Sequence, residues 1–264
     1  MLNTNLIFIK LGGSLITDKN QAETARVGLI RELLEQVRQF IREFPEKRIL
    51  LGHGSGSFGH YVGSKYQTRE GVFTAEQWLG YQQVWQSAHK LNQIVMEQAE
   101  LAGLPVIGFP PSAAITTVDQ KIQSWNLGPI CSALEHGLMP VVFGDVVTDS
   151  KMGGTILSTE DLFGYLARVL HPSHIFLAGI EPGVFADFPQ NTRVLETISP
   201  TSVFSGHLAG SGSIDVTGGM LAKVSLMQEL VRDESGLQVR IFSALNPKDL
   251  LRIFLGEPLG TLIS

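Results

Sequence analysis

The chain has 264 residues, of which 44% are hydrophobic and 17% are charged, a balance typical of a folded globular protein rather than of a disordered chain. A formal net charge of −5 argues against a nucleic-acid-binding protein, which usually carries a basic face. The N-terminal segment lacks the features of a signal peptide, and no apolar run is long enough to span a bilayer. The one cysteine, Cys131, cannot form an internal disulfide, and we expect it to pack in the core of a cytoplasmic protein.

Short apolar strands alternate with helical periodicity along almost the whole chain. The strands are expected at 6–10, 48–52, 104–109, 138–145, 174–179, 237–242 and 259–264. The helices are expected at 26–44, 74–103, 128–137, 158–170, 219–233 and 246–255. Turn residues at 149–155 indicate a hairpin. This alternation predicts an α/β fold, a three-layer αβα sandwich with a mostly parallel open central sheet, formed as a single domain over residues 1–264.

Three glycine-rich loops follow strands or precede helices: KLGGS (10–14), GHGSGSFGH (52–60) and GSGSIDVTGGM (210–220). Ligands of open α/β sheets bind at such points, and glycine allows backbone N–H groups to approach an anion closely. Three such loops in one chain favour phosphate binding. The P-loop pattern is absent, and the GxGxxG match within 52–60 lacks the second strand and acidic residue of a dinucleotide-binding fold.

Three lysines lie beside these loops. Lys10 ends an apolar strand, where a buried ammonium group needs an anion, and Lys223 lies near a helix N-terminus, where a cation opposes the helix dipole unless an anion is close. Both positions favour phosphate binding. Lys19 either reaches over the same site or is simply solvated.

The histidines and carboxylates give weaker signals. His60 is expected on the first turn of a helix, where it can donate to a substrate oxyanion, and His53 is expected to satisfy a backbone group. The remaining histidines have no metal-ligand spacing, so no metal site formed by the protein is expected. Asp145 ends a strand, where it can hold a lysine or a metal ion. Glu160 and Asp161 begin a helix, and Asp161 is either a helix cap or a site residue.

These segments together resemble the amino-acid kinase superfamily, and within it the isopentenyl phosphate kinases. The segments that carry the resemblance are IKLGGSLITDK, GHGSGSFGH, PVVFGDVVTD, ILSTEDL and GSGSIDVTGGMLAKV, in this order. The histidine that ends GSFGH and the DVTGGM segment are typical of this branch of the superfamily. The resemblance covers nearly the whole chain.

The resemblance implies ATP-dependent phosphorylation of isopentenyl phosphate to isopentenyl diphosphate, with Mg²⁺, by a homodimer whose N-terminal part binds the acceptor and whose C-terminal part binds the nucleotide. The implied catalytic residues are Lys10, Lys19, His60 and Lys223. The implied acceptor-binding residues are Gly54, Ser55, Gly56, Gly59 and His60. The implied nucleotide-binding residues are Lys10, Gly12, Gly13, Ser14, Asp145, Glu160, Asp161, Gly183, Gly218 and Lys223.

Two departures from the family pattern affect the nucleotide side. Glu160 stands where the family usually has aspartate, and Ala178 and Gly179 stand where it commonly has threonine and aspartate. An apolar pocket for a prenyl tail has four aromatic candidates on the helix that follows His60, although their spacing is more typical of core residues: Phe73, Trp78, Tyr81 and Trp85. The alternatives are a fosfomycin kinase, another small phosphomonoester or phosphonate kinase, or a nucleotide-binding sensor or storage protein without catalysis.

Overall fold

The computed structural model describes residues 3–187, 190–202 and 219–264, apart from the side chains of Thr4 and His60. A large sheet runs through the described part of the chain, with the strand order β10-β12-β11-β9-β1-β2-β6-β3. Among the described pairs of this sheet, β11 and β12 are antiparallel and the others are parallel. Its strands are β1 (Asn3–Leu11), β2 (Arg48–His53), β3 (Val106–Gly108), β6 (Met139–Phe143), β9 (Pro172–Gly179), β10 (Thr197–Ile198), β11 (Gln238–Ser243) and β12 (Thr261–Ile263).

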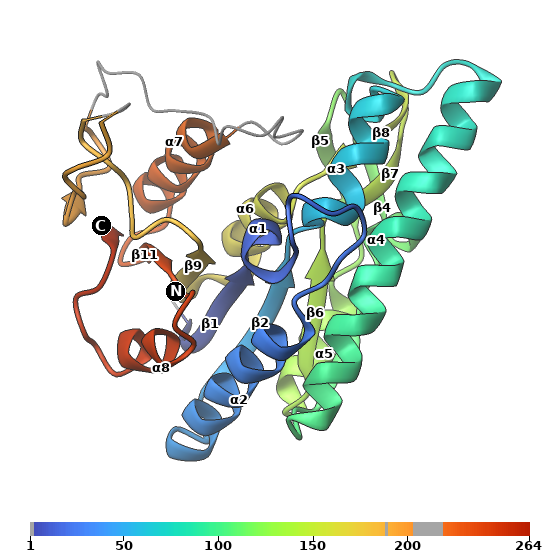
Figure 1. The fold of residues 1–264 in the computed structure, drawn as a ribbon. Helices are drawn as coiled ribbons and strands as arrows, with labels where there is room; N and C mark the ends of the chain where they lie inside the picture. Colours follow the sequence, from blue (N-terminus) through green and yellow to red (C-terminus); the bar gives the residue numbers. More distant parts are fainter. Residues whose placement is uncertain (1–2, 188–189, 203–218) are drawn as a thin grey trace.

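Helices cover both faces of this sheet (Figure 1). One face packs against α2 (Val27–Glu43), α4 (Ala75–Leu101) and α8 (Lys248–Phe254). The other face packs against α5 (Gly128–Glu135), α6 (Thr159–Leu170) and α7 (Gly219–Asp233). The predicted three-layer α/β fold with a mostly parallel sheet is therefore confirmed.

Side chains of β1 alternate between the two cores, as the period of a strand requires. Ile7, Ile9 and Leu11 belong to the core under α2, α4 and α8, whereas Leu6 and Phe8 belong to the core under α5, α6 and α7. Lys10 follows the parity of Leu6 and Phe8. The strand therefore directs Lys10 toward α6 and α7.

A second, smaller sheet has the order β5-β4-β7-β8 and lies beside α3 and α4 in Figure 1. Its strands are β4 (Ile115–Val118), β5 (Lys121–Trp125), β7 (Asp145–Asp149) and β8 (Gly153–Leu157). The predicted hairpin at 149–155 is confirmed as the antiparallel pair β7–β8. The single strand predicted at 138–145 is wrong, because it divides at Gly144 into β6 and β7, one in each sheet. The sequence did not reveal β4 and β5.

Shorter elements connect these layers: α1 (Gly13–Ile16), α3 (Gly56–Lys65), and the 3₁₀ turns η1 (Thr68–Glu70) and η2 (Pro111–Ala113). The long helix α4 begins at a capping box formed by Thr74 and Gln77, as the sequence predicts. Cys131, expected in the core, is partly exposed on α5. Within the described residues, no helix is both long and apolar enough to cross a membrane.

Candidate active site

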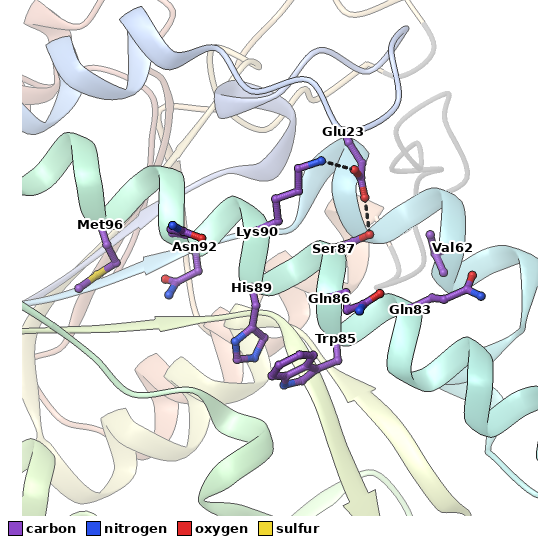
Figure 2. Close-up of a pocket in the computed structure, with 11 residues that line it drawn as sticks. Glu23, Val62, Gln83, Trp85, Gln86, Ser87, His89, Lys90, Asn92 and Met96 are labelled. Atoms are coloured by element: carbon purple, nitrogen blue, oxygen red, sulfur yellow. Dashed lines mark hydrogen bonds and ion pairs between the residues drawn. The ribbon is translucent and has the colours of Figure 1, made fainter.

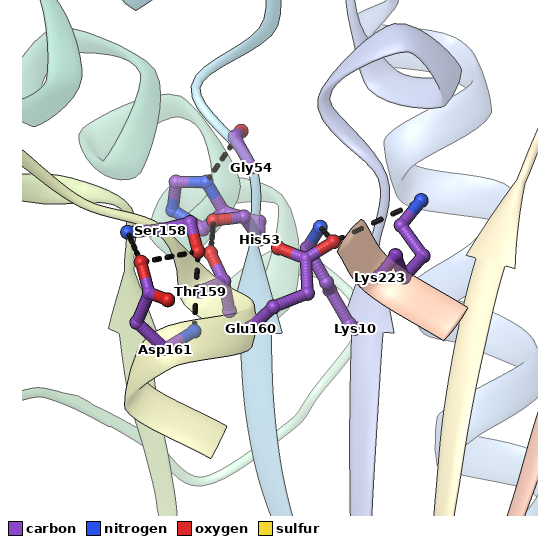
Figure 3. Close-up of polar contacts among 8 residues, drawn as sticks. All are labelled: Lys10, His53, Gly54, Ser158, Thr159, Glu160, Asp161 and Lys223. Carbon is purple, nitrogen blue, oxygen red and sulfur yellow. Dashed lines mark hydrogen bonds and ion pairs between the residues drawn. The ribbon is translucent and has the colours of Figure 1, made fainter. Parts of the chain in front are cut away.

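A buried ion cluster lies where β1 meets the first turns of α6 and α7. Lys10 Nζ donates to Glu160 Oε1 at 2.5 Å, and Lys223 Nζ lies 3.8 Å from the same oxygen (Figure 3). The side chains of Lys10 and Glu160 are 9% and 11% exposed, whereas that of Lys223 is 28% exposed. Two ammonium groups therefore share one carboxylate.

The electrostatics of Glu160 follow from this arrangement. Burial by itself raises the pKa of the Glu160 carboxyl, but the charges of Lys10 and Lys223 and the hydrogen bond from Lys10 outweigh burial and bring the pKa to about 2. Glu160 is therefore ionised at neutral pH. The sequence predicted an anion beside both lysines, and in the structure this anion is Glu160. Lys10, Glu160 and Lys223, each predicted as a site residue, therefore lie together in the structure.

The first two glycine loops pack backbone against backbone. A Cβ on Gly13 would lie 2.3 Å from the N atom of Gly56, and a Cβ on Gly54 would lie 2.7 Å from the N atom of Gly13. Gly56 also has a φ of +48°, which favours glycine. Any side chain here would force the loops apart, so close packing requires these glycines independently of a ligand.

Some backbone donors of these loops already have partners. The N–H of Gly12 donates to the Ala178 carbonyl at 2.7 Å, and the N–H of Gly54 donates to the Leu11 carbonyl at 3.0 Å. The Gly12 N–H is therefore not open to a phosphate in this conformation. Among the described residues, the N–H groups of Gly13, Ser55 and Gly56 have no hydrogen-bond acceptor. These donors lie at the junction of the two loops, where they can hold an anion.

Two threonines connect the glycine loops to their surroundings. Thr17 Oγ1 donates to the Gly13 carbonyl at 2.7 Å and accepts a hydrogen bond from the N–H of Ser57 at 2.9 Å, so it bridges the two loops. Thr159 Oγ1 donates to the His53 carbonyl at 2.6 Å and joins the start of α6 to the end of β2. The sequence analysis did not identify either threonine, because a single hydroxyl residue in a loop has no periodic signal.

Asp145 and Asp161 have structural partners. The buried carboxylate of Asp145 lies 3.2 Å from His89 Nε2 and accepts a hydrogen bond from the N–H of Ser112 at 3.2 Å. Its described partners are thus a histidine and backbone N–H groups rather than a lysine, and its role at the nucleotide site stays a prediction. Asp161 forms a capping box with Ser158, which supports the interpretation as a helix cap.

Asp161 also pairs with a residue that the sequence analysis missed. Arg69 Nη2 lies 3.5 Å from Asp161 Oδ2, and the carbonyl of Arg69 accepts hydrogen bonds from Thr155 and Gln120. Arg69 thus ties η1 to α6 and to the second sheet. No spacing in the sequence connects it with Asp161, since the two residues belong to separate elements.

The prediction that His53 hydrogen-bonds to a backbone group is confirmed. Its ring is buried, with Nδ1 3.2 Å from the Gly54 carbonyl and Nε2 3.1 Å from the side-chain oxygen of Asn92. Burial lowers the pKa of the His53 ring. A neutral His53 therefore supports the second glycine loop rather than supplying charge to the site.

The two remaining predicted catalytic residues, and Ser14, which was predicted to bind the nucleotide, are placed as follows. Lys19 is exposed on the loop 17–26 that follows α1, and His60 lies in α3, the helix that begins at Gly56. Ser14 lies in α1, next to the open N–H of Gly13. These residues stay predictions as site residues.

Three further glycines that were predicted as site residues have different surroundings in the structure. A Cβ on Gly59 would lie 2.4 Å from Ser55 Oγ, so the first turn of α3 requires a small residue there. Gly183, expected beside the nucleotide, packs against Thr261 and Val194, since its Cβ would lie 2.6 Å from each side chain. Gly218 and most of the third glycine loop lie outside the described residues.

A small apolar cluster, separate from the two main cores, lies between α3, α4 and the β7–β8 hairpin. We call it the side cluster, and its members are Val62, Tyr81, Val84, Val146 and Ile156. Burial, and then the charge of Asp145, raise the pKa of Tyr81 to about 12. The other aromatic candidates are exposed, so the expectation that they are core residues is wrong: Phe73 is 66%, Trp78 42% and Trp85 39% exposed.

The arrangement suits the binding of phosphate groups. An ion cluster with two lysines adjoins two glycine loops that have open N–H groups, and an apolar cluster lies further along α3. Positively charged side chains and fixed backbone donors stabilise the charge of a phosphoryl group in transfer. The described residues hold no group of three or more histidines, cysteines or carboxylates able to bind a metal ion.

Comparison with known proteins agrees with this geometry. A model of the amino acid kinase family matches residues 5–243. The isopentenyl phosphate kinase of Methanothermobacter thermautotrophicus is 31% identical, over 98% of this chain and 99% of that protein. The isopentenyl phosphate kinase of Methanocaldococcus jannaschii is 27% identical, over 97% of both chains. A crystal structure of an isopentenyl phosphate kinase superposes with a TM-score of 0.81 at 29% identity, over 98% of this chain and 100% of that one.

Proposed function

The chain belongs to the amino acid kinase family, and we propose that it transfers the γ-phosphoryl group of ATP to isopentenyl phosphate, forming isopentenyl diphosphate and ADP. The observation that carries the proposal is similarity over nearly the full length to isopentenyl phosphate kinases. The proposal therefore concerns the whole chain, with the acceptor toward its N-terminal part and the nucleotide toward its C-terminal part.

The ion cluster supports a role in phosphoryl transfer. A phosphomonoester acceptor is largely dianionic at pH 7, since its second pKa is about 6, so it needs no general base. The main barrier is the approach of two anions, and positive charge at fixed positions lowers it. Lys10 and Lys223 supply this charge, and Glu160 orients both ammonium groups. Lys19 joins them from the loop 17–26 in our proposal.

The acceptor is proposed to bind along α3. Its phosphate would accept hydrogen bonds from the N–H groups of Ser55 and Gly56 and from His60, and its tail would lie at the side cluster. Val62 follows Gly56 by six residues, which corresponds to about 9 Å along a helix. A short branched hydrocarbon chain matches this separation between a phosphate site and an apolar site.

Mg²⁺ is expected with ATP, but the three carboxylates predicted for the nucleotide site already have protein partners. Glu160 is paired with two lysines, Asp145 faces His89, and Asp161 caps α6. Magnesium usually enters such enzymes on the phosphates of the nucleotide, with few protein ligands. We therefore assign no residue to the ion. The homodimer and the cytoplasmic location stay predictions.

ADP release from Mg·ATP tests the proposal, with isopentenyl phosphate, dimethylallyl phosphate and fosfomycin supplied in parallel. We expect turnover on the prenyl phosphates, lost in His60→Ala and Lys10→Met and retained in the control Lys248→Met, an exposed residue at the start of α8. Turnover on fosfomycin alone would replace the proposed acceptor but keep the kinase. ATP binding without release on any acceptor would favour the sensor hypothesis.

A further inference from the structure

The loop 17–26, which carries Lys19, is closed on itself at its base. Thr17 and Ala25 form an antiparallel bridge, the N–H of Asp18 donates to the Thr24 carbonyl at 2.8 Å, and the N–H of Arg26 donates to the Ile16 carbonyl at 2.8 Å. These bonds fix where the loop leaves and re-enters the fold. They do not determine how its outer part, with Lys19, lies relative to the site.

Glu23 attaches the outer part of this loop to α4. Glu23 Oε1 accepts a hydrogen bond from Ser87 Oγ at 2.6 Å, and Glu23 Oε2 accepts one from Lys90 Nζ at 2.6 Å (Figure 2). Both carboxylate oxygens are thus used, by two residues one turn apart on the same helix face. The hydrogen bonds from Lys90 and Ser87 lower the pKa of Glu23, so the carboxylate is ionised at neutral pH.

The same contacts reach the second glycine loop. The N–H of Glu23 donates to the Ser57 carbonyl at 3.3 Å, and Lys90 Nζ lies 5.9 Å from the centre of the Phe58 ring. Glu23 adopts a φ of +48°, a left-handed conformation that a residue other than glycine adopts at a cost. Three elements therefore meet at Glu23: the loop 17–26, the start of α3, and α4.

This contact is suited to local positioning rather than to overall stability. The side chains of Glu23 and Lys90 are 37% and 58% exposed, and ion pairs this exposed contribute little to the free energy of unfolding. The effect on the reaction rate is different, because a small displacement of a cation that takes part in phosphoryl transfer lowers the rate strongly. A weak contact that holds the loop of such a cation can therefore matter for catalysis.

We propose that Glu23 is a positioning residue, which with Ser87 and Lys90 holds the loop 17–26 against α4 and thereby places Lys19 over the site of phosphoryl transfer. This inference rests on the proposed function of Lys19. It also couples the loop to α4, the helix that carries Tyr81 and Val84 of the side cluster, so the acceptor side and the transferring phosphoryl group share one support.

Amide hydrogen exchange of residues 18–25 tests the contact without reference to activity. In Glu23→Gln we expect these amides to exchange at least about tenfold faster, with the urea unfolding midpoint almost unchanged. The matched control is Glu35→Gln, which breaks the exposed pair of Glu35 with Arg31 on α2 and leaves the loop intact. Unchanged exchange in Glu23→Gln would overturn the proposal, whatever the enzyme phosphorylates.

Kinetics test the effect on Lys19. We expect Glu23→Gln to lower kcat about tenfold with little change in the KM for the acceptor, and the charge reversal Glu23→Lys with Lys90→Glu to restore most of it. In a Lys19→Ala background, Glu23→Gln should have almost no further effect, because both changes remove the same contribution. Additive effects would show that Glu23 does not act through Lys19. No turnover in the wild type would refute the proposed function alone, since hydrogen exchange still decides the contact.

Discussion

Lys10 and Glu160 are 150 positions apart in the sequence, and their side chains meet at 2.5 Å in the buried centre of the site. The pair joins the end of β1 to the first turn of α6, and Lys223 adds α7 to it. One carboxylate thus contacts two of the three lysines that are predicted for the site. Glutamate at this position has one more methylene than the aspartate usual in the family that the sequence resembles.

Replacing Glu160 tests this arrangement. In Glu160→Gln two ammonium groups lose their shared counter-charge, so we expect kcat to fall between about 10- and 100-fold. Glu160→Asp keeps the charge and should retain activity within about tenfold of the wild type. Steady-state assays with saturating ATP measure both variants. A larger loss in the aspartate variant than in the glutamine variant would show that side-chain length matters more than charge.

A matched pair of glycine substitutions tests the packing of the glycine loops. In Gly13→Ala the new Cβ would meet the backbone of Gly56 at 2.3 Å, so we expect a loss of about 1–3 kcal/mol in the free energy of unfolding, together with lost activity. Gly28, on α2, has no atom within 4 Å of its Cβ position, and Gly28→Ala should be neutral or stabilising by up to about 1 kcal/mol. Urea unfolding of both variants measures the difference.

The bridging hydroxyl of Thr17 gives a third prediction. Thr17→Val keeps the shape of the buried side chain but leaves the Ser57 N–H without its acceptor, at a cost of about 1–3 kcal/mol. The Gly13 carbonyl loses the hydroxyl but keeps the hydrogen bond from the backbone N–H of Thr17 at 3.0 Å. Thr17→Ser keeps the hydroxyl and should lose less stability and less activity. A loss in Thr17→Ser as large as that in Thr17→Val would contradict this prediction, because it would show that the methyl group, which only valine retains, contributes as much as the hydroxyl.

Asp149 gives a prediction for acid stability. Its carboxylate accepts hydrogen bonds from Thr117 Oγ1 and from the N–H groups of Asp119, Gln120, Lys151 and Met152, so it joins the turns at the tips of both hairpins of the second sheet. Burial raises the pKa of Asp149, but these hydrogen bonds outweigh burial and hold it well below its usual range.

The direction of the pH effect follows from this lowered pKa. The contribution of Asp149 is complete above the unfolded value of about 3.9 and is lost as the pH falls below it. We expect Asp149→Asn to unfold at lower urea than the wild type at pH 7, with the difference shrinking toward pH 3. A difference that is constant between pH 7 and pH 3 would contradict the role of the charge.

Much of the fold could be predicted because its signals are local. The periods of apolar residues placed β1, β2, β9, β11 and the covering helices, and short-range capping chemistry placed the starts of α4 and α6. The hairpin β4–β5 was missed, because its strands have few apolar residues and β5 is largely exposed. We predicted a single strand at 138–145 where the structure has β6 and β7, because Gly144 lies within an otherwise apolar run and gives no signal that a strand ends there.

The sequence by itself determined the α/β class and the loops that hold the site, and the alternation along β1 already directed Lys10 to one face of the sheet. Only the tertiary structure decided that Glu160 joins Lys10 to Lys223, that Asp145 faces His89, and that Glu23 ties the Lys19 loop to α4. The physical reason is that strand and helix periods are encoded within a few residues. The partner of a buried charge depends instead on how elements distant in the sequence pack.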